Sequence, residues 1–598
     1  MNVLGISAHY HDSAAALVVD GMPVCAVQEE RLSRSKHDST FPTRAIEWCL
    51  NHAGLDADEL DAVVFYERSM LKFERILTSA LRTFPHSWRS FPHAMKNSLG
   101  EKVWVRGIIS SYLGVPRQKI MFTGHHEAHA AAAFLTAPTR RAAILTADGV
   151  GEWATLTVGH GSRRGRGGSN GAGTAITLLR EIRFPHSLGM LYSTFTAYLG
   201  FTVNEDEYKV MGLAAYGRPT MVDRVRKLIT RTPDGAFVLD MDYFEYHTSA
   251  TRSYSSRFIE LFGPPRNSYE PIDLETADGR RYADCAASVQ RVLEDTLVDM
   301  TRALHQETGL PDLCLAGGVA LNVVANARIL AESGFERVFV PSAPGDAGCA
   351  LGAALYADRV YLGNPDHEVP DHPFWGPAVD AQELARAARE DEQTVEELDD
   401  PALIERIADE LVAGRVIGWM DGASEFGPRA LGHRSILAAP HSTAMRDRLN
   451  RDIKYREQFR PFAPVTPTEW ADRYFDLPPG GARLARYMSG VFPVRPEWRS
   501  QLAAVTHVDG SARVQALERA MAPRLHALLE AYGRRTGIPV LLNTSFNIAG
   551  EPMVNHALEA YSTFRRCGID ALVAGPTLVT KPALSPVIKP PAAVERML

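Results

Sequence analysis

The sequence is poor in cysteine and holds no two cysteines in a CxxC arrangement. Its six cysteines are Cys25, Cys49, Cys285, Cys314, Cys349 and Cys567. Six in 598 residues, so widely scattered, argue against a disulfide framework and against a cysteine-rich zinc fold. Several stand in apolar runs, as in the segment 313–315, which favours reduced thiols packed in a core.

Long apolar runs and an excess of positive charge are also missing. No stretch approaches the roughly 20 consecutive apolar residues of a membrane-spanning helix. The N-terminal residues 1–5 have no basic flank or extended apolar segment of the kind that marks a signal peptide. A net charge of −7 argues against a broad nucleic-acid surface, although a local basic pocket stays open. The sequence therefore predicts a soluble cytoplasmic protein without membrane or nucleic-acid partners.

Two similar patterns of short apolar runs are present in the first part of the chain. Residues 2–7, 14–19 and 24–28 predict three strands joined by a polar loop at 9–13 and an Asp20-Gly21 turn. Residues 142–146, 153–159 and 175–182 repeat the pattern around an Asp148-Gly149 turn. Two such meanders suggest an internal duplication. By analogy of fold, this arrangement is typical of the actin and sugar-kinase superfamily, which holds a nucleotide between two lobes.

A histidine pair at helical spacing follows a strand-like run at 119–122. The segment Gly124-His125-His126-Glu127-Ala128-His129 leads into an alanine run, so a helix is expected over 125–135. His125 and His129 share one face of that helix, which suits two imidazoles binding one metal ion. The alternative is that these histidines only cap or hydrogen-bond. Asp148 and Asp346, each in a loop after a predicted strand, would complete a nitrogen and oxygen donor set for iron, zinc or manganese.

Two further segments of the first part carry candidate phosphate contacts. Lys209 stands in an acidic stretch, where it either meets a phosphate or pairs with its neighbours. Gly317 and Gly318 form a strand-to-helix turn that ends at Asn322, and glycines there let backbone N–H groups approach a phosphate. Close packing of the strand on the helix would require small residues equally.

Proline-rich sequence from about 363 to 377 marks a predicted domain boundary. We expect a first domain over residues 1–364, a linker at about 365–377 and a second domain over 378–598. The second domain has basic residues beside glycine, proline and aromatic residues, notably in the segments 425–435, 454–464 and 507–513. This setting is more typical of a shaped anion pocket than of a solvated helix face, although arginines paired with local acids are the alternative.

The order of these motifs over nearly the full chain resembles the NodU/CmcH-type O-carbamoyltransferases, which modify antibiotics and nodulation factors. The motifs that carry the resemblance are His-Asp-Ser-Ala-Ala at His11, His-His-Glu-Ala-His at His125, Glu-Tyr-Lys-Val-Met-Gly-Leu-Ala at Glu207, Gly-Gly-Val-Ala-Leu-Asn at Gly317, Glu-Phe-Gly-Pro-Arg-Ala-Leu-Gly at Glu425, Phe-Arg-Pro-Phe-Ala-Pro at Phe459 and Asn-Thr-Ser-Phe-Asn at Asn543. The resemblance implies an α/β protein. Its first domain would be duplicated and actin-like, similar to the tRNA threonylcarbamoyl transferase TsaD, and its second domain would have the YrdC-like α/β fold.

The resemblance also implies two half-reactions. In the second domain, carbamoyl phosphate and ATP, the latter with Mg²⁺, would form carbamoyl-adenylate and release pyrophosphate and phosphate. The residues that match the family's phosphate and carbamoyl ligands are Lys454, Arg460, Arg513 and Ser545, with Arg429 as a further candidate. Preorganised cations of this kind stabilise the charge that develops on a polyphosphate.

In the first domain the adenylate would lie near Lys209, Gly317, Gly318 and Asn322, and its carbamoyl group would pass to a hydroxyl of a small-molecule acceptor. The implied metal ligands are His125, His129, Asp148 and Asp346, with iron(II) favoured and zinc or manganese left open. His11 is the expected general base and Asp12 its orienting partner, or a contact to the acceptor. The acceptor stays open, as does the oligomeric state, with a homodimer as one alternative.

Three other classes are weighed against this hypothesis. A zinc peptidase would need glutamate directly after the first histidine, but Glu127 is two residues after His125. An actin-like kinase or hydrolase would leave the basic second domain without a role, and a scaffold protein would not need the four converging ligands. The role of His9 stays open, and the Arg/Gly-rich segment 162–173 is expected to be an exposed hairpin loop.

Overall fold

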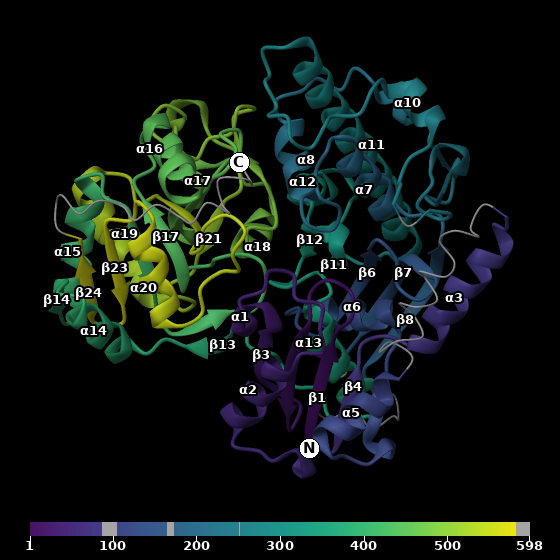
Figure 1. Ribbon diagram of the computed structural model, residues 1–598, viewed down its shortest axis with the longest axis horizontal. Coiled ribbons are helices and arrows are strands. Elements are labelled where there is room, and N and C mark those ends of the chain that lie inside the picture. The colour runs from purple at the N-terminus through teal and green to yellow at the C-terminus, as the bar shows by residue number, and fades with distance from the viewer. Residues whose placement is uncertain (86–103, 164–172, 250, 582–598) are drawn as a thin grey trace. The chain divides into compact units, whose positions relative to one another are not determined.

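The computed structural model of the protein describes residues 1–85, 104–163, 173–249 and 251–581 (Figure 1). The chain divides into two compact units. The first contains residues 1–29 and 39–371, and the second contains residues 30–38 together with the chain from His372 onward.

The first unit begins with a five-stranded sheet in the order β3-β2-β1-β4-β5. Its strands are β1 (Asn2–Ser7), β2 (Ala14–Val19), β3 (Met22–Gln28), β4 (Ala62–Phe65) and β5 (Ile120–Phe122). The first three form the predicted antiparallel meander, whereas β4 is parallel to β1 and β5 is parallel to β4. Helix α13 (Gly348–Tyr356) packs on this sheet so closely that a Cβ at Gly5 would lie 1.9 Å from the carbonyl oxygen of Ala350.

A second sheet repeats this topology in the order β8-β7-β6-β11-β12. Its strands are β6 (Arg141–Ala147), β7 (Ala154–Ser162), β8 (Ala175–Arg183), β11 (Asp312–Ala316) and β12 (Arg337–Phe339). Again three antiparallel strands precede two parallel ones. The same strand order in both halves confirms the predicted duplication, and the first unit has the α/β architecture expected of an actin-like domain.

Helices cover these sheets and fill the connections between them. They are α2 (Thr43–Ala53), α3 (Ser69–Arg82), α5 (Val105–Leu113), α6 (His125–Phe134), α7 (Leu188–Tyr198), α8 (Glu207–Ala214), α9 (Val222–Val225), α10 (Ser256–Phe262), α11 (Ala277–Thr308) and α12 (Val323–Glu332), and a small hairpin joins β9 (Ile229–Arg231) to β10 (Phe237–Leu239). Helix α6 is buried along its whole length because its alanines let it pack against α13, β6 and β11.

The second unit is a mixed α/β layer structure around an eight-stranded sheet, in the order β14-β24-β23-β15-β17-β22-β18-β21. These strands are β14 (Thr394–Glu397), β15 (Ile417–Met420), β17 (Arg434–Ala438), β18 (Ala463–Pro467), β21 (Gln515–Leu517), β22 (Leu541–Ser545), β23 (Ala571–Ala574) and β24 (Thr577–Thr580). Its helices include α14 (Ala381–Glu390), α15 (Asp400–Val412), α16 (Thr443–Arg448), α17 (Thr468–Tyr474), α18 (Gly481–Arg486), α19 (Pro523–Thr536) and α20 (Ala557–Arg566). Short pairs β13 (Phe374–Ala378) with β16 (Ala423–Glu425), and β19 (Phe492–Pro493) with β20 (Ser511–Ala512), lie outside the large sheet.

The short segment 30–38, which includes most of α1 (Glu29–Ser33), belongs to the second unit. Arg31 Nη2 donates to the carbonyl oxygen of Gly427 at 2.7 Å, and Arg34 Nη1 donates to that of Met553 at 2.8 Å. These bonds to the chain beyond residue 371 explain why a stretch so near the N-terminus is grouped there.

The predicted linker at 365–377 and the start of the predicted hairpin loop at 162–173 have more structure than expected. The end of the proline-rich stretch 365–377 forms strand β13, whose pairing with β16 is irregular, as strands that contain proline often are. The Arg/Gly-rich stretch joins β7 to β8, and its residues 164–172 lie outside the described part of the chain. Arg163 is not solvated as expected: it is buried, and its Nε lies 2.7 Å from Asp366 Oδ2.

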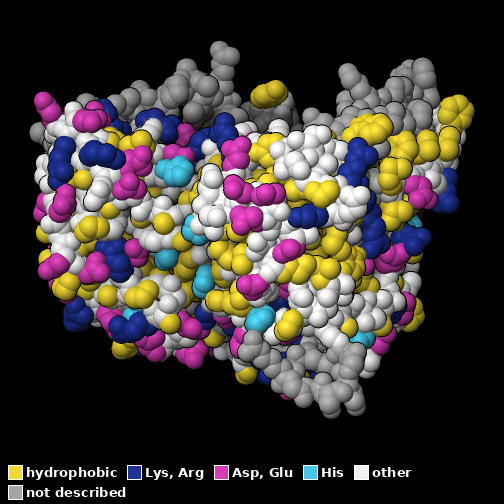
Figure 2. Space-filling view, turned by 90° about the horizontal axis from the view of Figure 1, so that it is seen from below, with side chains coloured by type: hydrophobic (Ala, Val, Ile, Leu, Met, Phe, Trp, Pro, Cys, Tyr) yellow, Lys and Arg dark blue, Asp and Glu magenta, His cyan; other side chains and the backbone are white. Residues whose placement is uncertain are grey.

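The structure confirms the expected state of the cysteines, all six of which are free and buried. Within the described residues, no helix is both long and apolar enough to cross a membrane. Acidic, basic and hydrophobic side chains are interspersed over the face drawn in Figure 2.

Candidate metal centre and anion site

The histidine helix begins directly after the edge strand of the first sheet. Strand β5 ends at Phe122, Gly124 takes an extended conformation, and α6 starts at His125. Glu127 accepts a hydrogen bond from the Gly124 amide at 2.7 Å, which satisfies one of the donors left free at a helix N-terminus. His125 and His129 are one turn apart, so their imidazoles project in the same direction.

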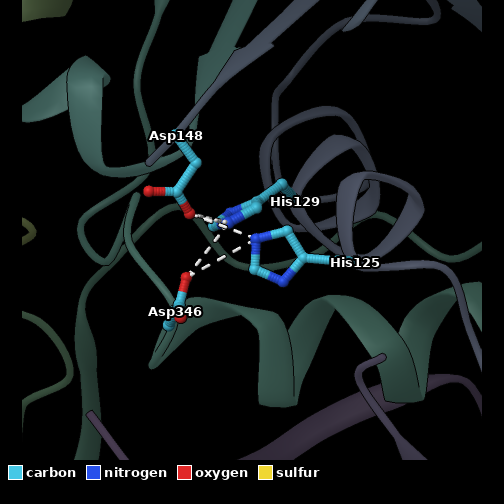
Figure 3. Close-up of side chains that lie close together, drawn as sticks. All are labelled: His125, His129, Asp148 and Asp346. Carbon is cyan, nitrogen blue, oxygen red and sulfur yellow. Dashed lines mark hydrogen bonds and ion pairs between the residues drawn. The ribbon is translucent and has the colours of Figure 1, made fainter. Parts of the chain in front are cut away.

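The two imidazoles meet two carboxylates in the interior of the first unit (Figure 3). Asp148 Oδ2 lies 3.1 Å from the Nε2 atoms of both His125 and His129. Asp346 Oδ1 lies 3.8 Å from the first and 3.3 Å from the second. Asp148 follows β6 and Asp346 precedes α13, so the duplicated fold brings together the four residues expected from the sequence. All four side chains are buried.

The charges of this cluster call for a cation. Although burial acts to raise the pKa of Asp148, the adjacent imidazoles hold it well below its usual range. Burial acts to lower the pKa of His129, yet neighbouring acidic groups, Cys349 and the two aspartates among them, raise it well above the usual value. Both carboxylate oxygens of Asp346 are buried without a hydrogen-bond partner among the described residues. A buried carboxylate charge is costly unless positive charge or hydrogen bonds compensate it.

The donor set fits a divalent transition metal. Donors about 2.1 Å from a shared ion are separated by roughly 3.0 Å in octahedral and 3.4 Å in tetrahedral geometry. The observed separations of 3.1–3.8 Å lie close to this range. Two imidazoles with two carboxylates would also balance the charge of a divalent ion. The identity of the metal remains a proposal.

Two residues that the sequence analysis did not select hold this arrangement in place. Glu152 accepts the backbone N–H of His125 at 3.0 Å and thereby fixes the start of α6. His126 contacts Thr146 Oγ1 at 2.7 Å and the Ala154 carbonyl oxygen at 3.0 Å, and burial lowers its pKa to about 3, so it is neutral. His126 was visible within the motif, whereas nothing in the sequence pattern marks Glu152.

The loop between β1 and β2 carries the predicted base. His11 Nδ1 lies 2.9 Å from Asp12 Oδ2. Burial acts to lower the pKa of His11, but the Asp12 hydrogen bond and the charges of Asp346 and Asp148 outweigh it and raise the pKa to about 9. While both aspartates are unscreened, the raised pKa of His11 therefore favours its protonated form at neutral pH. A cation bound between Asp148 and Asp346 would offset part of the negative charge that raises the pKa of His11.

The remaining candidates of the first unit have structural partners. Lys209 Nζ lies 3.2 Å from Asp206 Oδ1, and the Asn322 side chain caps α12 while it exchanges hydrogen bonds with Gln290. Gly317 has a φ of 90°, and a Cβ there would lie 2.1 Å from the Ala147 carbonyl oxygen. A Cβ on Gly318 would lie 3.0 Å from Asp148 Oδ1, so this turn adjoins the metal ligands. Close packing therefore explains both glycines, and their contact with a nucleotide stays a prediction.

In the second unit the structure brings Lys454 and Ser545 together. Lys454 follows the short π-helix η7 (Leu449–Ile453), and its Nζ donates to Ser545 Oγ at 3.2 Å. Further acceptors are the Ser545 carbonyl oxygen at 2.8 Å and Asn547 Oδ1 at 2.7 Å. Burial, with the positive charges of Arg456 and Arg460, lowers the pKa of Lys454 well below its usual range. None of these acceptors is a carboxylate. Asn547 lies in the quoted motif but was not selected.

Arg513 of the second unit is also a buried cation, and the charges of two other arginines, Arg429 and Arg460, act on it. The pKa of Arg513 is lowered well below its ordinary value by burial and by the charges of Arg429 and Arg460. Its buried Nε has no hydrogen-bond partner in the described part of the chain. Arg460 also lies 3.6 Å from Glu457. The positive charges of Arg429 and Arg460 act against that of Arg513, and an anionic ligand would offset this repulsion.

The fold and these two sites define an α/β protein with a buried transition-metal donor set on a duplicated scaffold and a cationic site on a second unit. The sequence profile described as Carbamoyltransferase N-terminus matches residues 2–355, and the one described as Carbamoyltransferase C-terminus matches residues 408–581. The chain therefore belongs to the carbamoyltransferase family, and it is a transferase.

Individual relatives agree with this assignment. Nodulation protein NolNO of Sinorhizobium fredii is 37% identical over 96% of this chain and 80% of its own length. Nodulation protein U of Rhizobium tropici is 30% identical over 92% of this chain and 91% of its own. 3'-Hydroxymethylcephem-O-carbamoyltransferase of Amycolatopsis lactamdurans is 31% identical over 66% and 69%, respectively. Among solved structures, T. kodakarensis HypF aligns with 60% of this chain and 48% of its own chain at 15% identity. The TM-score of this alignment is 0.29.

Proposed function

We propose that this protein is an ATP-dependent O-carbamoyltransferase that works in two half-reactions. Carbamoyl phosphate, ATP and one water give carbamoyl-adenylate, pyrophosphate and phosphate. The carbamoyl carbon then forms a bond to an acceptor hydroxyl oxygen, its bond to AMP breaks, and the hydroxyl proton leaves. The observation that carries this proposal is the presence of two chemically different sites, one cationic and one built from metal-type donors, within a chain of the carbamoyltransferase family.

The second unit would make the adenylate. Lys454, Arg513 and Arg460, with Arg429 beside them, supply fixed positive charge, and no carboxylate of the described residues forms an ion pair with Lys454 or Arg513. Polyphosphate and carbamoyl phosphate both carry charge that such groups stabilise, most strongly where charge develops during transfer. Binding of these anions would raise the depressed pKa values of Lys454 and Arg513 toward their ordinary range.

The first unit would carry out the transfer. A divalent cation held by His125, His129, Asp148 and Asp346 would supply Lewis acidity, with iron(II), zinc and manganese as the candidates. With His11 Nδ1–H donating to Asp12, the ring presents Nε2 to accept the proton of the acceptor hydroxyl. Asp12 thus fixes both the tautomer and the orientation of the imidazole.

The acceptor would be a hydroxylated natural product. The relative named 3'-hydroxymethylcephem-O-carbamoyltransferase favours an antibiotic, and the nodulation proteins favour a different hydroxylated molecule. We further propose that the protein acts in the cytoplasm and binds Mg²⁺ with ATP. A homodimer is compatible with this scheme.

The alternative is an actin-like kinase or hydrolase that uses ATP without carbamoyl phosphate. Incorporation of labelled pyrophosphate into ATP, measured with and without carbamoyl phosphate, separates the two. We expect exchange only when carbamoyl phosphate is present, and a product 43 mass units heavier than the acceptor, that is, about the mass of one carbamoyl group replacing a proton. Formation of ADP and a phosphorylated acceptor would instead identify a kinase.

A further inference from the structure

Helix α3 of the first unit has the reverse of the usual amphipathic pattern. Its buried side chains are Ser69, Lys72 and Arg75, three residues apart and therefore on one face. Apolar Met70 and Leu81, in contrast, expose 61% and 66% of their surface. A surface helix normally directs its apolar face inward. A buried polar face indicates that this side of α3 borders a polar ligand rather than a core.

Arg75 is a buried cation without a hydrogen-bond acceptor in the described part of the chain. It exposes only 7% of its surface, yet its guanidinium has no hydrogen bond or ion pair with any described residue. Its guanidinium carbon lies over the ring of Phe184, 5.2 Å from the centroid. The N–H donors of its Nη1 are thus buried without an acceptor on a full positive charge, which is costly in a protein without a ligand.

The nearby carboxylates are already used by other groups. Both oxygens of Glu67 accept from Lys72 Nζ, at 2.8 and 3.0 Å. Glu152 accepts the backbone N–H groups of His125 and Arg68. Neither acid lies within ion-pair distance of Arg75, so each acts on its guanidinium only through longer-range electrostatics.

Tyr10 connects this helix face to the metal centre. The charges of Asp148, Asp346 and Arg75 all act on its hydroxyl, whose pKa burial raises well above the ordinary value. A Cβ at Gly149, the residue after Asp148, would lie 3.6 Å from the Tyr10 oxygen. Lys72 Nζ lies 5.4 Å from the centroid of the Tyr10 ring. Tyr10 therefore lies close both to the polar face of α3 and to the turn that carries Asp148.

We infer that Arg75, together with Ser69 and Tyr10, forms an oxyanion subsite beside the metal centre, which binds a phosphoryl or carboxylate group of a small molecule taking part in the transfer. The guanidinium supplies a paired set of donors for such a group, and the Ser69 hydroxyl, also buried without a partner, supplies another. This inference rests on the proposed function only for the identity of the ligand. The group is either the phosphoryl of the carbamoyl donor or a carboxylate of the acceptor.

The test measures anion binding in full-length protein. The parent carries Lys454→Met, so that the cationic site of the second unit binds AMP weakly, and Arg75→Met is added to it. Arg82→Met, an exposed arginine on the same helix, is the matched control. We expect Arg75→Met to weaken AMP binding about 10- to 100-fold while adenosine, which lacks the phosphoryl group, binds as before. Weakened binding of benzoate with unchanged AMP would assign the subsite to an acceptor carboxylate. Unchanged binding of both anions would overturn the inference.

The melting temperature of the ligand-free protein separates this role from a structural one. Removal of an uncompensated buried charge should leave the melting temperature unchanged or raise it. A large decrease in Arg75→Met, with both anion affinities retained, would show that Arg75 serves packing alone. Anion binding is measured without turnover. An enzyme that fails to carbamoylate any acceptor would therefore refute the proposed function but leave this result intact.

Discussion

Replacement of Asp12 with asparagine tests the electrostatics of the proposed base. The pKa of His11 is raised to about 9 from an ordinary value of 6.5. At 1.36 kcal/mol per pKa unit this difference corresponds to roughly 3 kcal/mol of preference for the protonated ring. Asp12 contributes both a hydrogen bond and a charge, so we expect Asp12→Asn to lower the pKa of His11 by about one unit or more.

The same shift has a consequence for stability. Because the pKa of His11 is higher in the folded than in the unfolded state, its stabilising contribution is complete below about pH 6.5. It is lost as the pH rises through about 9. The free energy of unfolding of the metal-free protein should therefore fall between pH 6 and pH 10, and His11→Gln should remove about 3 kcal/mol of that fall.

The assay is a pH titration of ¹³C-labelled histidine signals in chelator-treated protein, with urea unfolding at both ends of the range. The exposed His52 on α2 provides an internal control, since its signal should be the same in wild type and in Asp12→Asn. An unchanged midpoint for His11 in Asp12→Asn would refute the assigned cause of the shift. An equal pH dependence of unfolding in wild type and His11→Gln would refute the linkage.

Three further outcomes are expected. His125→Ala should reduce metal content, measured by mass spectrometry of the element, from about one ion per chain to a small fraction, because a buried ligand is lost; a full complement in the variant would contradict the assigned ligands. Lys454→Met should abolish carbamoyl-phosphate-dependent pyrophosphate exchange but leave transfer from supplied carbamoyl-adenylate detectable; equal loss of both steps would contradict the division of labour between the units. Gly317→Ala should lower the melting temperature by several degrees, since its φ of 90° and the 2.1 Å approach to Ala147 add strain of roughly 1–3 kcal/mol; an unchanged melting temperature would show that the turn relaxes freely.

Periodic features of the chain were predictable from the sequence. Alternating apolar runs and turn residues located both meanders, and the histidine spacing located α6, because strands and helices impose these periods directly. Asp148 and Asp346 could be selected because each lies in a loop that follows a strand, where polar side chains of an α/β fold tend to gather.

Features that depend on tertiary packing were not predictable. The Asn322 side chain caps α12 and bonds to Gln290, contacts that its residue type alone does not reveal, while its contact with a nucleotide stays a prediction. Lys209 forms an ion pair with Asp206, and pairing with an acidic neighbour was one of its two expected alternatives. Glu152 and Arg75 belong to no motif, and only the folded chain shows that one caps α6 and that the other is buried without an acid. A single polar residue carries no period, so its burial cannot be inferred from sequence spacing.

The metal ligands are divided between the two halves of the duplicated first unit: the histidines follow the first sheet, whereas the aspartates belong to the second. An ion bound to all four would cross-link the halves, so they could not separate widely without breaking coordination bonds. We therefore expect small molecules to enter and leave this unit through local movement of peripheral segments, while the halves stay joined throughout the catalytic cycle. Duplication supplied two equivalent frameworks, but each now contributes a different kind of donor, and neither half alone retains a complete centre.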